Sequence, residues 1–71
     1  MGDLVECYSG AEYAEQPRKF FWQGNWRTVS RIRSEHRTPG GKQFEVEDEE
    51  QGRFLLTYDS GPDLWTIQPA P

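Results

Sequence analysis

The feature of this sequence that most restricts its fold is a regular alternation of apolar and polar residues, which begins after Pro17. A period of two is typical of β-strands that bury one face. Glycine-bearing turns separate the alternating runs, as in strands that are joined by hairpins. The sequence therefore predicts an all-β fold, an antiparallel meander of four to five strands that forms a curled sheet or a small, partly open barrel.

The first two loops predict a strand register, because a slip of one residue turns every side chain to the other face. A three-residue loop at 23–25 places Trp22 opposite Trp26 on the apolar face. A three-residue loop at 39–41 places Ser34 opposite Val46 and His36 opposite Phe44.

The last two loops extend this register. In the loop 50–52, glycine stands where a type I turn with a bulge needs a left-handed residue, so we expect Gly52 to have a positive φ. This loop pairs Val46 with Leu56. The turn at 60–63 then lets Tyr58 face Trp65 and Leu56 face Ile67.

These registers gather most of the large apolar side chains on one face of the sheet. Val29 and Phe21 fall on the other face, which predicts a bulge or a strong bend in the long second strand. An early strand at Leu4–Tyr8 is expected to extend the sheet. The apolar face consists of Phe20, Trp22, Trp26, Ile32, Phe44, Val46, Phe54, Leu56, Tyr58, Trp65 and Ile67.

The length of 71 residues predicts a single small β domain over residues 1–71. Within it, residues 1–16 are expected to be a less regular segment with a turn or a single helical turn at Gly10–Gln16, and residues 69–71 a frayed tail. A chain this short buries only about 60% of its unfolded surface, so its core depends on large side chains. Ten aromatic residues supply them.

Several residue types argue against metal, redox and membrane functions. Cys7 is the single cysteine and His36 the single histidine, so no internal disulfide and no four-ligand zinc site are expected. Cys7 is interpreted as a small core residue. The sequence has no apolar run of membrane-spanning length and no signal peptide, which predicts a cytoplasmic protein without membrane contact.

No constellation for catalysis is evident in the sequence. His36 has no nucleophile or orienting carboxylate in a suitable position, because its neighbour Glu35 points to the opposite face of a strand. The carboxylates of residues 48–50 lack the ligand spacing of a calcium loop and are interpreted as a solvated turn. We therefore expect no enzyme, no cofactor and no small-molecule substrate.

The charges are unevenly distributed along the chain, although the net charge is −4 and the sequence pI about 4.8. Residues 17–42 hold seven of the eight basic residues and one acid. Residues 43–71 hold seven acids and one arginine. Such an acidic chain does not bind nucleic acid through its bulk charge, so any such binding would depend on the basic half.

The candidate binding surface lies on the basic strand 27–37. Cations interleaved with aromatic rings are typical of sheets that bind single-stranded nucleic acid. The register, however, places Arg31 opposite Glu49 and Arg33 opposite Glu47, which would neutralise both and leave Arg27 and Arg37. The candidate surface consists of Arg27, Arg31, Arg33, Arg37 and Trp22.

Short motifs along the chain are shared with one known group of proteins. They are Tyr8-Ser9-Gly10, Tyr13-Ala14-Glu15-Gln16-Pro17, Phe20-Phe21-Trp22-Gln23-Gly24, Phe44-Glu45-Val46, Leu56-Thr57-Tyr58-Asp59 and Asp63-Leu64-Trp65. In these motifs the chain resembles a small all-β bacterial family of unknown function. A similar module is found at the C-terminus of some Y-family-polymerase-like proteins. The resemblance implies an accessory role near DNA or replication proteins, and no residue roles.

Two functions follow from these observations. The first is a non-enzymatic adaptor that binds another protein. The alternative is an accessory nucleic-acid-binding domain that uses the basic strand 27–37. Salt separates the two, because binding through several phosphates weakens steeply with salt, whereas an interface of buried aromatic rings does not.

Overall fold

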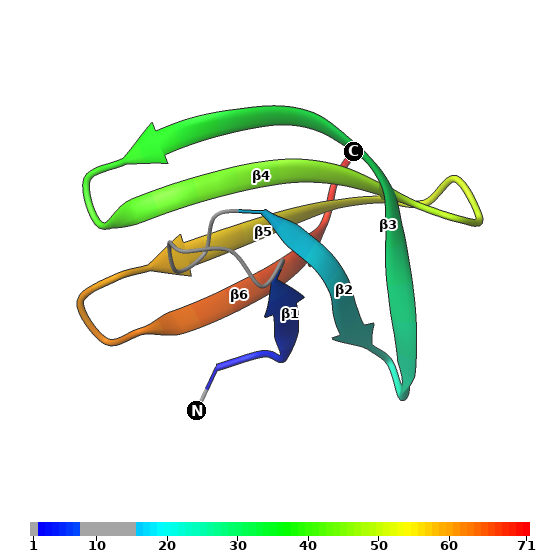
Figure 1. The fold of residues 1–71 in the computed structure, drawn as a ribbon, viewed down its shortest axis with the longest axis horizontal. Helices are drawn as coiled ribbons and strands as arrows, with labels where there is room; N and C mark the ends of the chain where they lie inside the picture. Colours follow the sequence, from blue (N-terminus) through cyan, green and yellow to red (C-terminus); the bar gives the residue numbers. More distant parts are fainter. Residues whose placement is uncertain (1, 8–15) are drawn as a thin grey trace.

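The computed structural model describes residues 2–7 and 16–71, and the regular structure within them is entirely β. Six strands follow one another in sequence and pair in the same order, each antiparallel to the next (Figure 1). The expected all-β meander is confirmed, with slightly more strands than the four to five expected. The strands are β1 (Val5–Cys7), β2 (Pro17–Trp22), β3 (Asn25–Thr38), β4 (Gly41–Asp48), β5 (Arg53–Asp59) and β6 (Leu64–Pro69).

The sheet curls into a half-barrel because β3 is long and bent (Figure 1). Residues 25–28 of β3 pair with β2, whereas residues from Val29 onward pair with β4. The register shifts between Val29 and Arg31 and again between Ile32 and Ser34. The predicted bulge is thus confirmed, and it brings Val29 and Ile32 against the core.

The N-terminal segment joins the two ends of the curled sheet. β1 pairs with β2, so the early strand expected at Leu4–Tyr8 is present over Val5–Cys7. The Asp3 N–H donates to the Trp65 carbonyl (2.9 Å), and the Asp3 carboxylate accepts from the Ile67 N–H (2.8 Å). These two bonds connect the first strand to the last.

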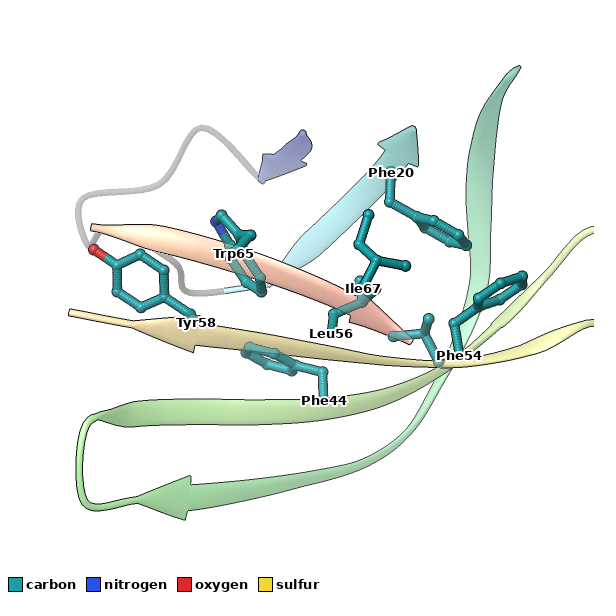
Figure 2. Packing of buried hydrophobic residues seen from close by; sticks show 8 residues of the cluster. Phe20, Phe44, Phe54, Leu56, Tyr58, Trp65 and Ile67 are labelled. Atoms are coloured by element: carbon teal, nitrogen blue, oxygen red, sulfur yellow. The ribbon is translucent and has the colours of Figure 1, made fainter. Parts of the chain in front are cut away.

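The core fills the concave side of the half-barrel and is rich in aromatic rings (Figure 2). The Phe20 ring on β2 lies 4.9 Å from the Phe54 ring on β5, so β2 folds over the face of the later strands. The expected apolar face is confirmed with the exception of Trp26. The buried hydrophobic side chains of the core are Phe20, Phe44, Val46, Phe54, Leu56, Tyr58, Trp65 and Ile67.

The first hairpin has a different register from the one expected. Its loop is two residues long, and Gln23 (φ 50°) and Gly24 (φ 85°) both have positive φ, as in a type I′ turn. Trp22 therefore pairs with Asn25, and Phe21 pairs with Trp26. The prediction that Trp22 and Trp26 face each other is wrong, because a type I′ turn matches the strand twist without a third loop residue.

The second hairpin also has a two-residue loop, Pro39-Gly40. Thr38 pairs with Gly41, and His36 pairs with Gln43 instead of Phe44. The expected pair of Ser34 and Val46 is also wrong, because the loop is one residue shorter than expected: Ser34 lies opposite Glu45, and Val46 lies opposite Ile32. Beyond the bulge, the strand returns Ile32 to the apolar face.

The turn after β4 is longer than expected, and its positive φ lies at Gln51 (68°) instead of Gly52. Val46 pairs with Phe54 instead of Leu56, a shift of two residues that leaves the faces unchanged. The expectation for Gly52 is wrong because the turn begins earlier. The Gln51 N–H donates to the Asp48 carbonyl (3.1 Å).

The last hairpin matches the expectation. Tyr58 pairs with Trp65, and Leu56 pairs with Ile67. At the end of the chain, Pro69 belongs to β6 and the Ala70 N–H donates to the Arg53 carbonyl (2.9 Å), so the chain stays paired beyond residue 69.

Most of the turn expected at Gly10–Gln16 lies outside the described residues. Within residues 2–7 and 16–71, the structure contains no helix of the length and apolarity needed to cross a membrane.

Candidate protein-interaction surface

Arg27, the first cation of the basic strand, is held on the concave side of the sheet. It lies opposite the buried Phe20, and its guanidinium stands 5.6 Å from the centre of the Phe54 ring. Its Nη1 donates to the buried Asp48 carboxylate at 3.1 Å. Arg27 therefore closes one end of the core, and its Nε is buried without a hydrogen-bond partner among the described residues.

Asp48 organises the turn between β4 and β5. Its Oδ1 accepts from the backbone N–H groups of Glu50 (2.9 Å) and Gly52 (2.7 Å), while its Oδ2 faces Arg27. Asp48 is buried, so residues 48–50 are more than the solvated turn expected from the sequence. The described residues contain no group of three or more possible metal ligands.

Arg33 and Arg31 lie on the convex face and differ in their partners. Arg33 forms ion pairs with Glu45 (3.7 Å) and Glu47 (3.8 Å), so its expected contact with Glu47 is present. Arg31 lies opposite Glu47 instead of Glu49, because the hairpin loop is one residue shorter than expected and a bulge between Ile32 and Ser34 shifts the register by one more residue. Among the described residues, Arg31 has no acidic partner within ion-pair distance.

Arg37 lies near the end of β3 on the concave side. It pairs in register with Lys42, which in turn lies opposite the buried Tyr58. The Lys42 ammonium pairs with Glu35 at 3.6 Å, so this acid is already engaged. Within the described part of the chain, Arg37 has no ion pair.

The five residues of the candidate surface do not share one face. Trp22 and Arg27 both contact Phe54 on the concave side, where the Trp22 ring lies 5.6 Å from the Phe54 ring. Arg31 and Arg33 lie on the convex face, and Arg37 lies at the far end of β3. The structure thus leaves Arg31 and Arg37 as the cations of strand 27–37 without an acidic partner among the described residues.

A row of apolar side chains on the convex face was not expected from the sequence. Phe21 and Trp26 pair across β2 and β3 with their rings 5.4 Å apart, nearly perpendicular. Leu4 lies beside Phe21, whose N–H donates to the Leu4 carbonyl (3.0 Å). Trp26 is 51% exposed and Leu4 57%. We call Leu4, Phe21 and Trp26 the convex apolar row.

One signal in the sequence points to this row. Three consecutive aromatic residues, Phe20, Phe21 and Trp22, precede the first loop. Successive side chains of a strand alternate between the faces, so the middle ring must lie on the outer face. With a two-residue loop, Trp26 on the next strand then lies opposite Phe21.

A hollow borders the exposed Trp26 ring. It has a volume of about 360 Å³ and is lined by residues 25–28 and 48–50. Of its acids, the buried Asp48 and the exposed Glu50 both pair with Arg27, at 3.1 and 3.7 Å, while Glu49 is exposed. The hollow therefore combines an aromatic ring with two exposed carboxylates.

The remaining reactive side chains are those of Cys7 and His36. Cys7 is half-buried against the core, and burial raises the pKa of its thiol. The interpretation of Cys7 as a core residue agrees with this position. His36 is exposed and lies opposite Gln43.

Comparisons of the chain with known protein families, with curated proteins and with solved structures found no match. The resemblance to a small bacterial family of unknown function therefore stays a prediction. Of its motifs, Tyr8-Ser9-Gly10 and most of the segment from Tyr13 to Pro17 lie outside the described residues.

Proposed function

We propose that this chain is a non-enzymatic interaction module that binds another protein through the convex apolar row. The observation that carries the proposal is the half-exposed Trp26, stacked edge-on against Phe21 outside the core. Tryptophan is one of the residue types enriched at the energetic centre of protein interfaces. The cytoplasmic location expected from the sequence belongs to the same proposal, and its support is the free thiol of Cys7, which reducing compartments preserve.

The hollow beside Trp26 indicates the chemistry of the partner. Glu49 and Glu50 line the same hollow as Trp26, and Glu50 also forms a 3.7 Å ion pair with Arg27. A lysine or arginine side chain fits such a place, because both the ring and the carboxylates attract a cation. The partner is therefore a protein surface that presents an apolar side chain and, beside it, a basic one.

The proposal is tested by capture followed by direct measurement. The immobilised chain is exposed to an extract of the cells that produce it, and retained proteins are identified by mass spectrometry. Each candidate is then purified and titrated against the wild type and Trp26→Ala by calorimetry. We expect Trp26→Ala to raise the dissociation constant by about 30-fold or more, as for a central interface residue.

Gln68→Ala is the control, since Gln68 is an exposed residue near the end of β6, away from the row. It should leave the affinity within about threefold of the wild type, because surface substitutions outside an interface change little. Circular dichroism of Trp26→Ala should remain unchanged, since Trp26 is not part of the core. Equal binding by the wild type and Trp26→Ala would contradict the proposed surface.

Nucleic-acid binding is the second candidate, and the exposure of Trp26 is the observation that favours it. The ring is accessible for stacking on a base, and Arg31 lies on the same convex face without an acidic partner among the described residues. Two phosphate contacts, from Arg31 and Arg37, give a salt slope of only about −1.4 for single strands. Sub-micromolar binding of labelled single-stranded DNA, lost in Arg31→Ala, would favour this candidate over the adaptor.

A further inference from the structure

The far half of β3 forms an open edge of the sheet. From Val29 to Thr38, β3 pairs with β4 on one side, while β2 reaches only as far as Thr28 on the other. Figure 1 shows this half of β3 as the outermost ribbon on its side. After the second bulge, residues 34–38 continue in regular register for five residues. No strand of the described chain covers their outward N–H and C=O groups.

The edge of the sheet at β6, by contrast, is partly covered by the N-terminal segment. On β6, the Trp65 carbonyl and the Ile67 N–H are both occupied by Asp3 (2.9 and 2.8 Å). Exposed edges are usually blunted in this way, since they otherwise pair with other chains. Pairing with an added strand is also a common mode of peptide recognition.

The charge along the open edge is positive. Residues 30–38 carry Arg31, Arg33 and Arg37 against the single acid Glu35. Glu35 is already paired with Lys42 at 3.6 Å. Arg31 and Arg37, which lie on opposite faces at the two ends of the edge, have no ion pair among the described residues.

A hollow continues the edge where β2 and β3 separate. It has a volume of about 280 Å³ and is lined by residues 16–19 and 28–32. These residues include Arg18, Lys19 and Arg31 and no acid. If an extended segment pairs with residues 34–38 and continues along β3 toward residue 28, its further residues reach this hollow.

A second copy of the chain fits the open edge poorly. Antiparallel pairing of two copies across residues 34–38 would be centred on His36 and would place Arg37 of each copy opposite Glu35 of the other. Glu35 is already paired with Lys42 at 3.6 Å, so each edge would still carry an excess of positive charge that repels the other edge. The described edge at β6 offers no acidic residue either, since Leu64–Pro69 is uncharged.

We propose that the open edge of β3 binds an extended acidic segment of a partner protein by strand addition. The segment pairs with the backbone of residues 34–38, and its carboxylates contact Arg31 and Arg37. The proposal rests on the proposed function in taking a protein as the partner. It uses a surface separate from the convex apolar row.

The test begins with a selection of random decapeptides displayed on phage against the immobilised chain. An enriched peptide is synthesised in three forms: unmodified, N-methylated at alternate amides, and with its acids replaced by amides. Binding is measured by fluorescence anisotropy. We expect enrichment of acidic, β-prone peptides and a loss of about tenfold or more for each modified form, since one lacks the ladder donors and the other the charge.

Variants of the chain locate the binding. Arg31→Glu and Arg37→Glu should each lower the affinity for the unmodified peptide by about threefold or more. Arg53→Glu is the control, since Arg53 is an exposed arginine on β5, and it should leave the affinity unchanged. The amide hydrogens of residues 34–38 should become protected from exchange when the peptide binds. Those of β6 should not change.

Several results would overturn the inference. Enrichment of neutral or basic peptides, or of no peptide, would contradict the proposal that the ligand is acidic. Equal binding of the N-methylated peptide would show charge contact without strand pairing. Displacement of the peptide by self-association or by single-stranded DNA would assign the edge to that occupant. A captured partner that responds to Trp26→Ala but not to Arg31→Glu or Arg37→Glu would overturn this inference and leave the proposed function standing. Peptide binding at the edge, without any captured partner that responds to Trp26→Ala, would support this inference and contradict the proposed function.

Discussion

Gly41 lies where the β3–β4 hairpin meets the end of β5, and a single added carbon would disturb this crossing. A Cβ at this position would overlap the Tyr58 carbonyl oxygen, which belongs to the backbone of a central strand. The backbone cannot move away easily, because the Ser60 N–H donates to the neighbouring Gly40 carbonyl at 2.7 Å. We expect Gly41→Ala to lower the free energy of unfolding by about 1–3 kcal/mol, measured by urea denaturation.

Gly61→Ala is the control for this prediction. A Cβ at Gly61 meets only an Asp59 carboxylate oxygen at 3.6 Å, an ordinary contact. Its free energy of unfolding should stay within about 0.5 kcal/mol of the wild type. Equal losses in the two variants would mean that the close approach at Gly41 does not determine stability.

The half-buried thiol of Cys7 predicts a dependence on pH. Burial raises its pKa in the folded chain, so the folded chain keeps the proton at pH values where the unfolded chain loses it. Alkylation by iodoacetamide should therefore be slower in the folded chain than in urea near the ordinary thiol pKa.

The same shift affects stability. The unfolded chain binds fewer protons once the pH passes the unfolded pKa, so stability falls as the pH rises toward the folded pKa. This slope should disappear in Cys7→Ser. Equal alkylation rates in the folded and unfolded chains would contradict the burial of the thiol.

Gly52 shows what the sequence can indicate about a single residue. The pattern correctly marks a turn there, but it assigns the positive φ to the glycine. In the structure Gln51 takes that conformation, and a Cβ at Gly52 would meet the Asp48 carboxylate at 3.0 Å and the Phe54 ring at 3.2 Å. A glycine that serves a close approach and one that serves a turn look alike in sequence.

At the scale of the elements, the β4–β5 turn depends on Asp48. Its carboxylate binds two backbone N–H groups and the Arg27 guanidinium, all in a partly buried place. Asp48→Ala would leave the Arg27 charge without its closest partner. We expect a loss of about 3–5 kcal/mol in the free energy of unfolding, measured by urea denaturation, as when one member of a buried pair is removed.

Two variants check the cause of that loss. Glu50→Ala removes the weaker and exposed partner of Arg27, at 3.7 Å, and should cost less than about 1 kcal/mol. Arg27→Met combined with Asp48→Ala should recover part of the stability, because the unpaired charge is then gone. A double variant as unstable as the sum of the single variants would exclude coupling between the two residues.

The hairpins show which elements can be predicted from sequence. The turn Ser60-Gly61-Pro62-Asp63 has strong turn residues throughout, and its register follows directly. Gln23-Gly24 lacks the asparagine or aspartate that usually marks a two-residue type I′ loop, so its length is ambiguous. One residue of error there turns Trp26 from the convex face into the core, which hides the convex apolar row. The pattern does predict a bulge or bend in β3, from Val29 and Phe21, but it does not give the two positions at which the register shifts.

At the scale of the whole molecule, the division into an apolar and a polar face is predictable, because an error of two residues leaves the faces unchanged. The later strands illustrate this, since Val46 and Phe44 are buried although both are paired differently from the expectation. The functional surfaces are less predictable. Their identification requires knowing where β2 ends beside β3, and this follows from the curl of the sheet.

The bonds from Asp3 to β6 bear on how fast the chain folds and unfolds. Each strand pairs with its neighbour in sequence, so most of the sheet forms by closing short loops, whereas Asp3 and Ile67 are 64 residues apart. Closing a longer loop costs more entropy, so this contact should form after the rate-limiting step. Stopped-flow measurements on Asp3→Ala should then show faster unfolding with an unchanged folding rate. Slower folding would instead mean that the two ends of the sheet meet early, before the meander between them is complete.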